Sequence, residues 1–110
     1  MFDRSVLEID LESEANYIVE RLRHLVGHGL RRRGLVVAVS GGIDSSVSCA
    51  LAVRAFEAAK VFALQLPERD SSAETGQRGR LLIEHLGVQS AVEDIAPTLD
   101  AIGCYRRALE

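Results

Sequence analysis

Apolar residues recur at three- and four-residue steps from Asp10 to Arg33, which is the pattern of an amphipathic helix with one face toward a core. The members of this stripe are Leu11, Ala15, Ile18, Val19, Leu22, Leu25, Val26 and Leu30. Asp10 or Ser13 is placed to cap its start, and Gly27 and Gly29 are expected to weaken its last turns. Residues 1–34 are therefore predicted to form an amino-terminal helical segment.

Beyond residue 34, short apolar runs alternate with helical patterns. The run Leu35 to Val39 is wholly apolar and rich in β-branched residues, which predicts a strand covered on both faces in a parallel sheet. Two more strands are predicted at 61–66 and 88–95, and three more helices at 44–58, from Ser71 to Gly87 and from Pro97 through Leu109. This order favours a three-layer α/β domain with a parallel sheet, spanning residues 1–110 as a single unit.

Composition narrows the function classes. The chain has 110 residues, 47% hydrophobic and 26% charged, and a net charge of −3, so a folded domain is expected and a nucleic-acid partner is not. No apolar stretch approaches the roughly 20 residues that span a bilayer, and no signal core follows Met1, so we expect a cytoplasmic protein without membrane contact. Cys49 and Cys104 are expected to be free thiols, and His24 and His28, which share a helix face, are expected to be surface residues and not metal ligands.

The residues best suited to bind a ligand or a metal lie between the first strand and the following helix, in the loop Ser40-Gly41-Gly42-Ile43-Asp44-Ser45-Ser46. Adjacent glycines allow the backbone N–H groups to surround an oxyanion, and the helix start adds further donors. The serine hydroxyls can donate to phosphate oxygens, and the carboxylate of Asp44 suits a magnesium ion that bridges the protein and a phosphate. The loop thus predicts a site for a phosphate-bearing ligand.

Two other phosphate-binding motifs do not fit this loop. It lacks the lysine and the spacing of a Walker A element, and it lacks the G-x-G-x-x-G spacing of dinucleotide folds. The alternative is an ordinary glycine-rich turn in which Asp44 or Ser45 merely caps the helix. A cap needs one polar side chain, whereas this loop carries three hydroxyls, an acid and two glycines.

The sequence Ser40 to Ser46 resembles the S-G-G-x-D-S pyrophosphate-binding loop of the N-type ATP pyrophosphatases, and S-G-G-I-D-S-S is most similar to the NAD synthetase group. The segments 61–72 and 94–101 are similar to the second strand, the following loop and the third strand of that group. The resemblance implies an adenine nucleotide alpha hydrolase-like (PP-loop, Rossmann-like) sheet, truncated here to about three strands.

The resemblance also implies a reaction. ATP and Mg²⁺ would activate the carboxylate of nicotinic acid adenine dinucleotide as an acyl-adenylate, and ammonia, from solution or from a separate glutaminase, would then form the amide. Carried over to this sequence, the nucleotide-binding residues would be Ala38, Val39, Ser40, Gly41, Gly42, Ile43, Asp44, Ser45, Ser46, Gln65 and Arg69. Asp44 would be the metal ligand, no side chain is assigned as a catalytic nucleophile, and a homo-oligomer is expected.

Synthetases of this group are more than twice as long as this chain, so later strands, the second acidic metal ligand and the acceptor-binding residues are not assigned. In the family's sheet the first strand is central, and a chain without the later strands would leave Leu35 to Val39 at an open edge, so we expect a fragment or a covering partner. Two alternatives remain: another ATP pyrophosphatase (GMP synthetase-like, sugar-amidating or tRNA-modifying), or a catalytically incomplete nucleotide-binding or dimerising module.

Overall fold

The computed structural model describes residues 3–110, and its centre is a three-stranded parallel sheet. The strands are β1 (Leu35–Ala38), β2 (Val61–Gln65) and β3 (Gln89–Val92), hydrogen-bonded in the order β1-β2-β3. In the register, Val36 lies opposite Phe62, and Phe62 lies opposite Gln89. The predicted parallel sheet is confirmed, and so is the position of the first strand at its edge.

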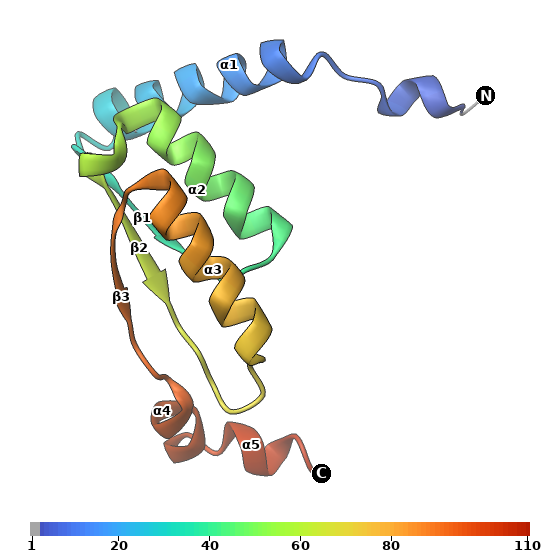
Figure 1. The fold of residues 1–110 in the computed structure, drawn as a ribbon, viewed down its shortest axis with the longest axis vertical. Helices are drawn as coiled ribbons and strands as arrows, with labels where there is room; N and C mark the ends of the chain where they lie inside the picture. The colour runs from blue at the N-terminus through green and yellow to red at the C-terminus, as the bar shows by residue number, and fades with distance from the viewer. Residues whose placement is uncertain (1–2) are drawn as a thin grey trace.

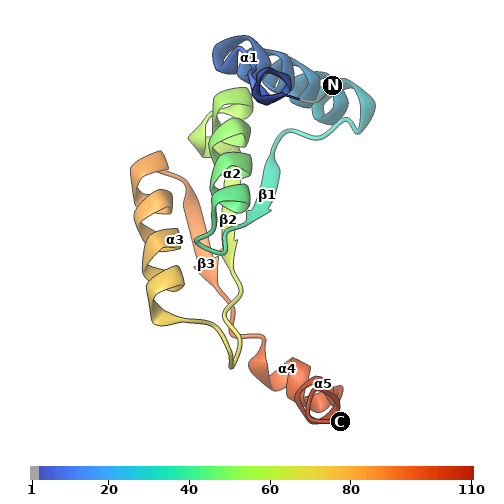
Figure 2. The ribbon, with the colours of Figure 1, turned by 90° about the vertical axis from the view of Figure 1, so that its right-hand side faces the viewer.

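Two helices cover one face of this sheet, as Figures 1 and 2 show. They are α2 (Ile43–Phe56), between β1 and β2, and α3 (Ala73–Leu86), between β2 and β3. The capping residue of α3 is Ser72, whose hydroxyl accepts the Thr75 N–H at 3.1 Å, so the cap predicted at Ser71 was one residue early. Gly87 ends α3 with a φ of +69°, as a left-handed carboxy-terminal cap requires.

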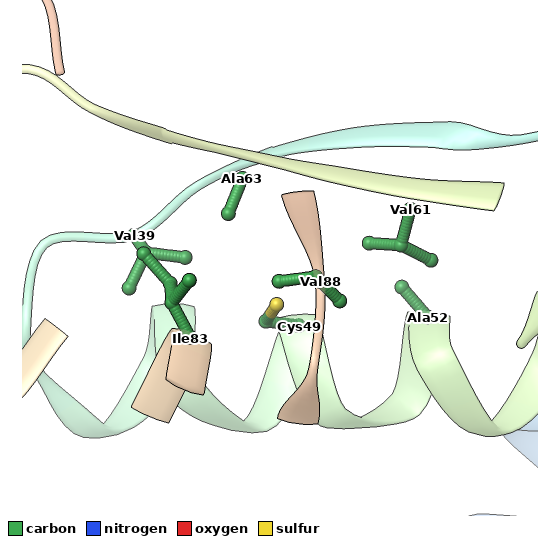
Figure 3. Packing of buried hydrophobic residues seen from close by; sticks show 7 residues of the cluster. All are labelled: Val39, Cys49, Ala52, Val61, Ala63, Ile83 and Val88. Carbon is green, nitrogen blue, oxygen red and sulfur yellow. The ribbon is translucent and has the colours of Figure 1, made fainter. Parts of the chain in front are cut away.

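The core is a single layer between the sheet and these two helices (Figure 3). Its buried side chains are small or medium-sized: Val39, Cys49, Ala52, Val61, Ala63, Ile83 and Val88. Cys49 is fully buried, whereas Cys104 is exposed, and both thiols are free, as predicted.

Among the described residues, no helix covers the opposite face of the sheet, so this face is bare (Figure 2). Along β1 the side chains alternate between half-buried and exposed, and Val36 is 65% exposed. The prediction that this strand is covered on both faces is therefore wrong for the described residues, because both helices that flank the strands lie on the same side of the sheet. The radius of gyration is 17.2 Å, compared with about 13 Å for a compact domain of this length, which reflects this open architecture.

The amino-terminal segment is a short 3-10 helix (Arg4–Leu7), α1 (Leu11–Leu22) and a π-helical continuation (Arg23–Gly29). Asp10 caps α1 by accepting the Ser13 N–H at 3.0 Å. The helix predicted to reach Arg33 ends at Gly29, because the glycines weaken its last turns and Arg31 takes a φ of +52°. Within the described residues, no helix is both long and apolar enough to cross a membrane.

Helix α1 packs across α2 and extends beyond it (Figures 1 and 2). Arg54 of α2 donates to Glu12 and Asn16 of α1, the latter at 2.7 Å, and Arg23 Nε donates to the Ala55 carbonyl at 2.9 Å. These contacts attach the amino-terminal segment to the α2 side of the molecule. A 3-10 turn (Ala58–Lys60) then leads from α2 into β2.

The carboxy-terminal segment lies at the other end of the sheet from α1 (Figure 1). A single helix from Pro97 through Leu109 was predicted, but the structure has two, α4 (Ala96–Ala101) and α5 (Cys104–Arg107). They are separated at Gly103, whose φ of +78° is incompatible with a continuous helix. Pro97 lies in the first turn of α4, where its missing N–H costs no hydrogen bond.

Candidate nucleotide-binding site

The loop between β1 and α2 is folded onto itself by serine hydroxyls. The Ser45 hydroxyl accepts the Ser40 N–H at 3.1 Å and lies 3.1 Å from the Ser40 hydroxyl, which in turn accepts the Gly42 N–H at 3.3 Å. The Ser46 hydroxyl donates to the Gly42 carbonyl at 2.6 Å. Serines at these spacings therefore shape the loop, in addition to any contact with a ligand.

Gly41 is required by the geometry of the loop. Its φ of +89° is one that residues with a side chain rarely adopt, and a β-carbon there would lie 2.1 Å from the Thr75 carbonyl oxygen in the first turn of α3. Gly42 follows as the residue that precedes α2, and no side chain of the described residues caps that helix. The glycine pair thus permits both the tight turn and an uncapped helix start.

The helix start can attract an anion. The first N–H groups of an α-helix have no partner within the helix, and the aligned peptide dipoles add a partial positive charge there. Asp44 lies in this first turn with its carboxylate exposed, and Ile43 beside it and Ala38 at the end of β1 are exposed as well. This is the arrangement in which a metal-bridged phosphate can be held by backbone donors and one carboxylate.

A cleft of about 550 Å³ opens beside this loop, between the ends of the strands and the first turns of α3. It is lined by Val39, Ser40, Gln65, Leu66, Pro67, Glu68, Ser71, Ser72, Ala73, Thr75, Gly76, Gln77, Arg80 and Val92. The carboxyl ends of parallel strands are where such folds bind ligands. Of these residues, Val39, Ser40 and Gln65 are among those that the sequence predicts to bind the nucleotide.

Gln65 joins the end of β2 to α3. Its side chain is 9% exposed, and its Nε2 donates to the Gly76 carbonyl at 3.0 Å. A β-carbon on Gly79 would lie 2.8 Å from the same nitrogen, so α3 passes close over this amide because residue 79 is a glycine. Gln65 is thus a wall of the cleft and a support of α3.

Arg69 does not line the cleft. Its guanidinium carbon lies 3.9 Å from the centre of the Tyr105 ring, and its backbone N–H donates to the Tyr105 hydroxyl at 3.0 Å. The same hydroxyl donates to Glu68 Oε2 at 2.8 Å, and burial is the largest cause of the raised pKa of Tyr105. The structure therefore places Arg69 against α5, with its side chain engaged there.

Several cleft residues were not predicted from the sequence, notably Glu68, Ser71, Ser72, Thr75 and Arg80. The available signal was position, because all of them follow β2, whose carboxyl end adjoins the loop after β1. Polar residues after neighbouring strand ends are expected to meet at one edge of the sheet.

Asp44 is the one acidic residue of the loop, so the chain offers a single carboxylate to a metal at that point. No group of three or more His, Cys, Asp or Glu side chains is assembled for a metal within residues 3–110. One carboxylate fits Mg²⁺, which is commonly bound by one or two carboxylates together with substrate phosphates. His24 and His28 lie with ring centres 5.6 Å apart, exposed on the π-helical segment and far in sequence from the loop.

Comparison with known proteins relates this chain to one family. The family model described as NAD synthase matches residues 14–107. Among curated relatives, the NH(3)-dependent NAD(+) synthetase of Rhizobium meliloti (strain 1021) is 55% identical over 97% of this chain and 32% of its own length. The protein of the same name from Mesorhizobium japonicum is 49% identical over 96% of this chain and 33% of its own. The chain spans about a third of the length of these relatives.

Solved structures agree with the observed fold. The NMN synthetase from Francisella tularensis aligns with a TM-score of 0.81 and 26% identity, over 92% of this chain and 41% of that one. The NH3-dependent NAD synthetase from Campylobacter jejuni, in complex with the nitrate ion, aligns with a TM-score of 0.80 and 26% identity, over 89% and 42%. The parallel sheet and its flanking helices are therefore those of PP-loop enzymes.

Proposed function

This chain belongs to the NAD synthase family, and on that premise we propose that it supplies the ATP-binding part of an amide-forming ligase. The observation that supports this most strongly is the loop Ser40–Ser46 at the start of α2, beside the 550 Å³ cleft. The loop combines a glycine in a left-handed conformation, an uncapped helix start among the described residues and one exposed carboxylate. Those features suit the polyphosphate of a nucleotide.

In the proposed reaction, a carboxylate oxygen of nicotinic acid adenine dinucleotide attacks the α-phosphorus of ATP, and the bond to pyrophosphate breaks. Ammonia then attacks the acyl carbon, losing a proton, and AMP leaves with the electron pair of the broken bond. Neither step needs a nucleophile from the protein. The required contributions are orientation of the reactants and stabilisation of the charge on the leaving pyrophosphate.

The residues of this chain would divide these tasks. The N–H groups at the start of α2 and the loop Ser40–Gly42 would hold the phosphates, and Gln65 and the first turns of α3 would bound the nucleotide in the cleft. Asp44 would hold Mg²⁺, which when bound would neutralise charge on the pyrophosphate. Arg69 belongs to this proposal only if a bound nucleotide draws its side chain away from Tyr105.

The acceptor is proposed from relatives. The two relatives at 55% and 49% identity are named NAD(+) synthetases, whereas the aligned NMN synthetase is 26% identical. The loop and the cleft contact the nucleotide, and do not distinguish acceptors. Because both of those relatives are named NAD(+) synthetases, nicotinic acid adenine dinucleotide and ammonia are favoured over the acceptors of the GMP synthetase-like, sugar-amidating and tRNA-modifying enzymes.

A second candidate function is that of a catalytically incomplete nucleotide-binding module. Two observations favour it: one face of the sheet is bare, and the chain spans about a third of the length of its relatives. On this reading the chain binds ATP weakly and turns over little by itself, because acceptor-binding residues are not among those assigned. Release of pyrophosphate from Mg-ATP, measured with nicotinic acid adenine dinucleotide and ammonia together and then with each left out, tests both readings. Release that requires nicotinic acid adenine dinucleotide, and that continues beyond one equivalent only when ammonia is also present, supports the ligase. ATP binding without release supports the incomplete module.

A further inference from the structure

Tyr105 connects the carboxy-terminal helix α5 to the loop between β2 and α3. It is 7% exposed, although α5 lies at the periphery of the molecule (Figure 1), and it is the buried residue of that helix. Its hydroxyl donates to Glu68 Oε2 at 2.8 Å and accepts the Arg69 N–H at 3.0 Å, and the Arg69 guanidinium lies over its ring. All these contacts are with two successive residues of the loop.

The rest of that loop is closed by its own hydrogen bonds. The Glu68 N–H donates to Ser71 Oγ at 2.9 Å, and the Ser71 N–H donates to the Glu68 carbonyl at 3.0 Å. The Pro67 carbonyl accepts the Ile95 N–H at 3.0 Å. The backbone of residues 67–71 therefore has a defined shape, and the hydrogen bond from Tyr105 determines where the Glu68 carboxylate is held.

The charge of Glu68 matters because of its position. Among the described residues that line the cleft, the charged side chains are Glu68 and Arg80. A carboxylate free to turn into the cleft would repel an anionic ligand and would compete with it for Arg80. A hydrogen bond from a phenol to a carboxylate is charge-assisted, and thus strong enough to restrain it.

We infer that Tyr105 is a positioning residue, which ties the Glu68 carboxylate to α5 and so keeps the cleft favourable to an anionic nucleotide. The inference rests on the proposed function, since it takes ATP as the ligand. It makes the carboxy-terminal helix, which does not line the cleft, a determinant of nucleotide affinity.

The test is titration calorimetry with Mg-ATP on the 110-residue chain and its variants. Tyr105→Phe keeps the ring under Arg69 and removes the hydroxyl, so affinity is expected to fall about tenfold, because the freed Glu68 carboxylate can turn toward the anionic ligand and repel it. Tyr17→Phe, at an exposed tyrosine of α1, is the matched control and should bind as the parent does. In the background of Glu68→Gln, Tyr105→Phe should lower affinity less than about threefold, because no charge is released.

Each outcome decides the inference. Equal tenfold losses with and without Glu68→Gln would mean that Tyr105 only stabilises the fold, and an unchanged affinity of Tyr105→Phe would also overturn the proposal. If Tyr105→Phe does not fold, Glu68→Gln alone decides, since it should tighten ATP binding about threefold and a tenfold loss would contradict this.

If the parent does not bind ATP, the proposed function fails separately. Hydrogen exchange of the Arg69 amide then tests the positioning, with faster exchange in Tyr105→Phe supporting it and equal exchange overturning it.

Discussion

A β-carbon on Gly41 would lie 2.1 Å from the carbonyl oxygen of Thr75, so the loop after β1 and the first turn of α3 meet backbone to backbone. The same turn is capped by Ser72 and receives the hydrogen bond from Gln65 Nε2 to the Gly76 carbonyl. The glycine-rich loop and the wall of the cleft are thus built as one unit. A change in either is expected to alter both stability and ligand binding.

Gly41→Ala is expected to destabilise the fold by roughly 2 to 4 kcal/mol. The alanine would have to adopt a φ of +89°, and its methyl group would clash with the backbone of Thr75. Gly76→Ala is the matched control, since a β-carbon there meets nothing within 4 Å, and it should stabilise α3 by about 0.5–1 kcal/mol. Denaturant unfolding monitored by circular dichroism measures both. Equal stabilities of the two variants would contradict the close packing.

Gln65→Leu is expected to cost about 1 kcal/mol of unfolding free energy, because it deletes the 3.0 Å hydrogen bond to the Gly76 carbonyl while keeping a side chain of similar size. Gln77→Leu makes the same chemical change at an exposed position of α3 and should change stability by less than about 0.5 kcal/mol. Parallel urea unfolding curves give the comparison. If the two substitutions cost the same, the Gln65 amide does not support α3.

The bare face of the sheet and the free edge of β1, which pairs with no second neighbour among residues 3–110, predict self-association of this chain at high concentration. Val36→Lys places a charge on that face and is expected to shift the chain toward a monomer. Leu81→Lys alters an apolar side chain of the same 65% exposure on α3 and should leave the association unchanged. Size-exclusion chromatography with light scattering over a concentration series is the measurement, and a parent that stays monomeric throughout would refute the prediction.

Stability is expected to fall as the pH rises above about 8.5, the ordinary pKa of a cysteine thiol. Burial raises the pKa of Cys49, so the folded state keeps a proton that the unfolded chain loses, and the stability it contributes below that pH is lost as the pH rises through the folded value. The raised pKa of Tyr105 acts in the same direction at higher pH. Unfolding curves between pH 7 and 10 should show a weaker decline for Cys49→Ala, and an identical decline would contradict this assignment.

The sequence predicted the features of the fold that are determined by residues close to one another in the chain. The strand at Leu35 to Ala38, the loop and the helix that follows are each encoded within a few positions by apolar runs and glycines. The cap of α3 was predicted one residue early because Ser71 and Ser72 are both capping residues by type. The break of the last helix at Gly103 was missed because a single glycine is also tolerated inside a helix, so the residue type alone does not show that its φ is positive.

The features that the sequence did not predict depend on contacts between residues that lie far apart in the chain. An apolar strand such as Leu35 to Val39 indicates burial on two faces, but it does not say which chain segment covers each face. The stacking of Arg69 on Tyr105, which is 36 residues later, was not predicted. A contact between residues so far apart produces no recognisable spacing in the sequence, so it can be identified only from the structure.

The central claim is that the loop Ser40–Ser46 binds the phosphates of ATP, and titration calorimetry with Mg-ATP tests it most directly. We expect weak but saturable binding by the parent and by Asp100→Ala, which removes an exposed acid of α4. Asp44→Ala is expected to bind at least about tenfold more weakly, because a charged ligand of the bridging metal is lost. No binding by the parent, or equal binding by Asp44→Ala and Asp100→Ala, would contradict the account.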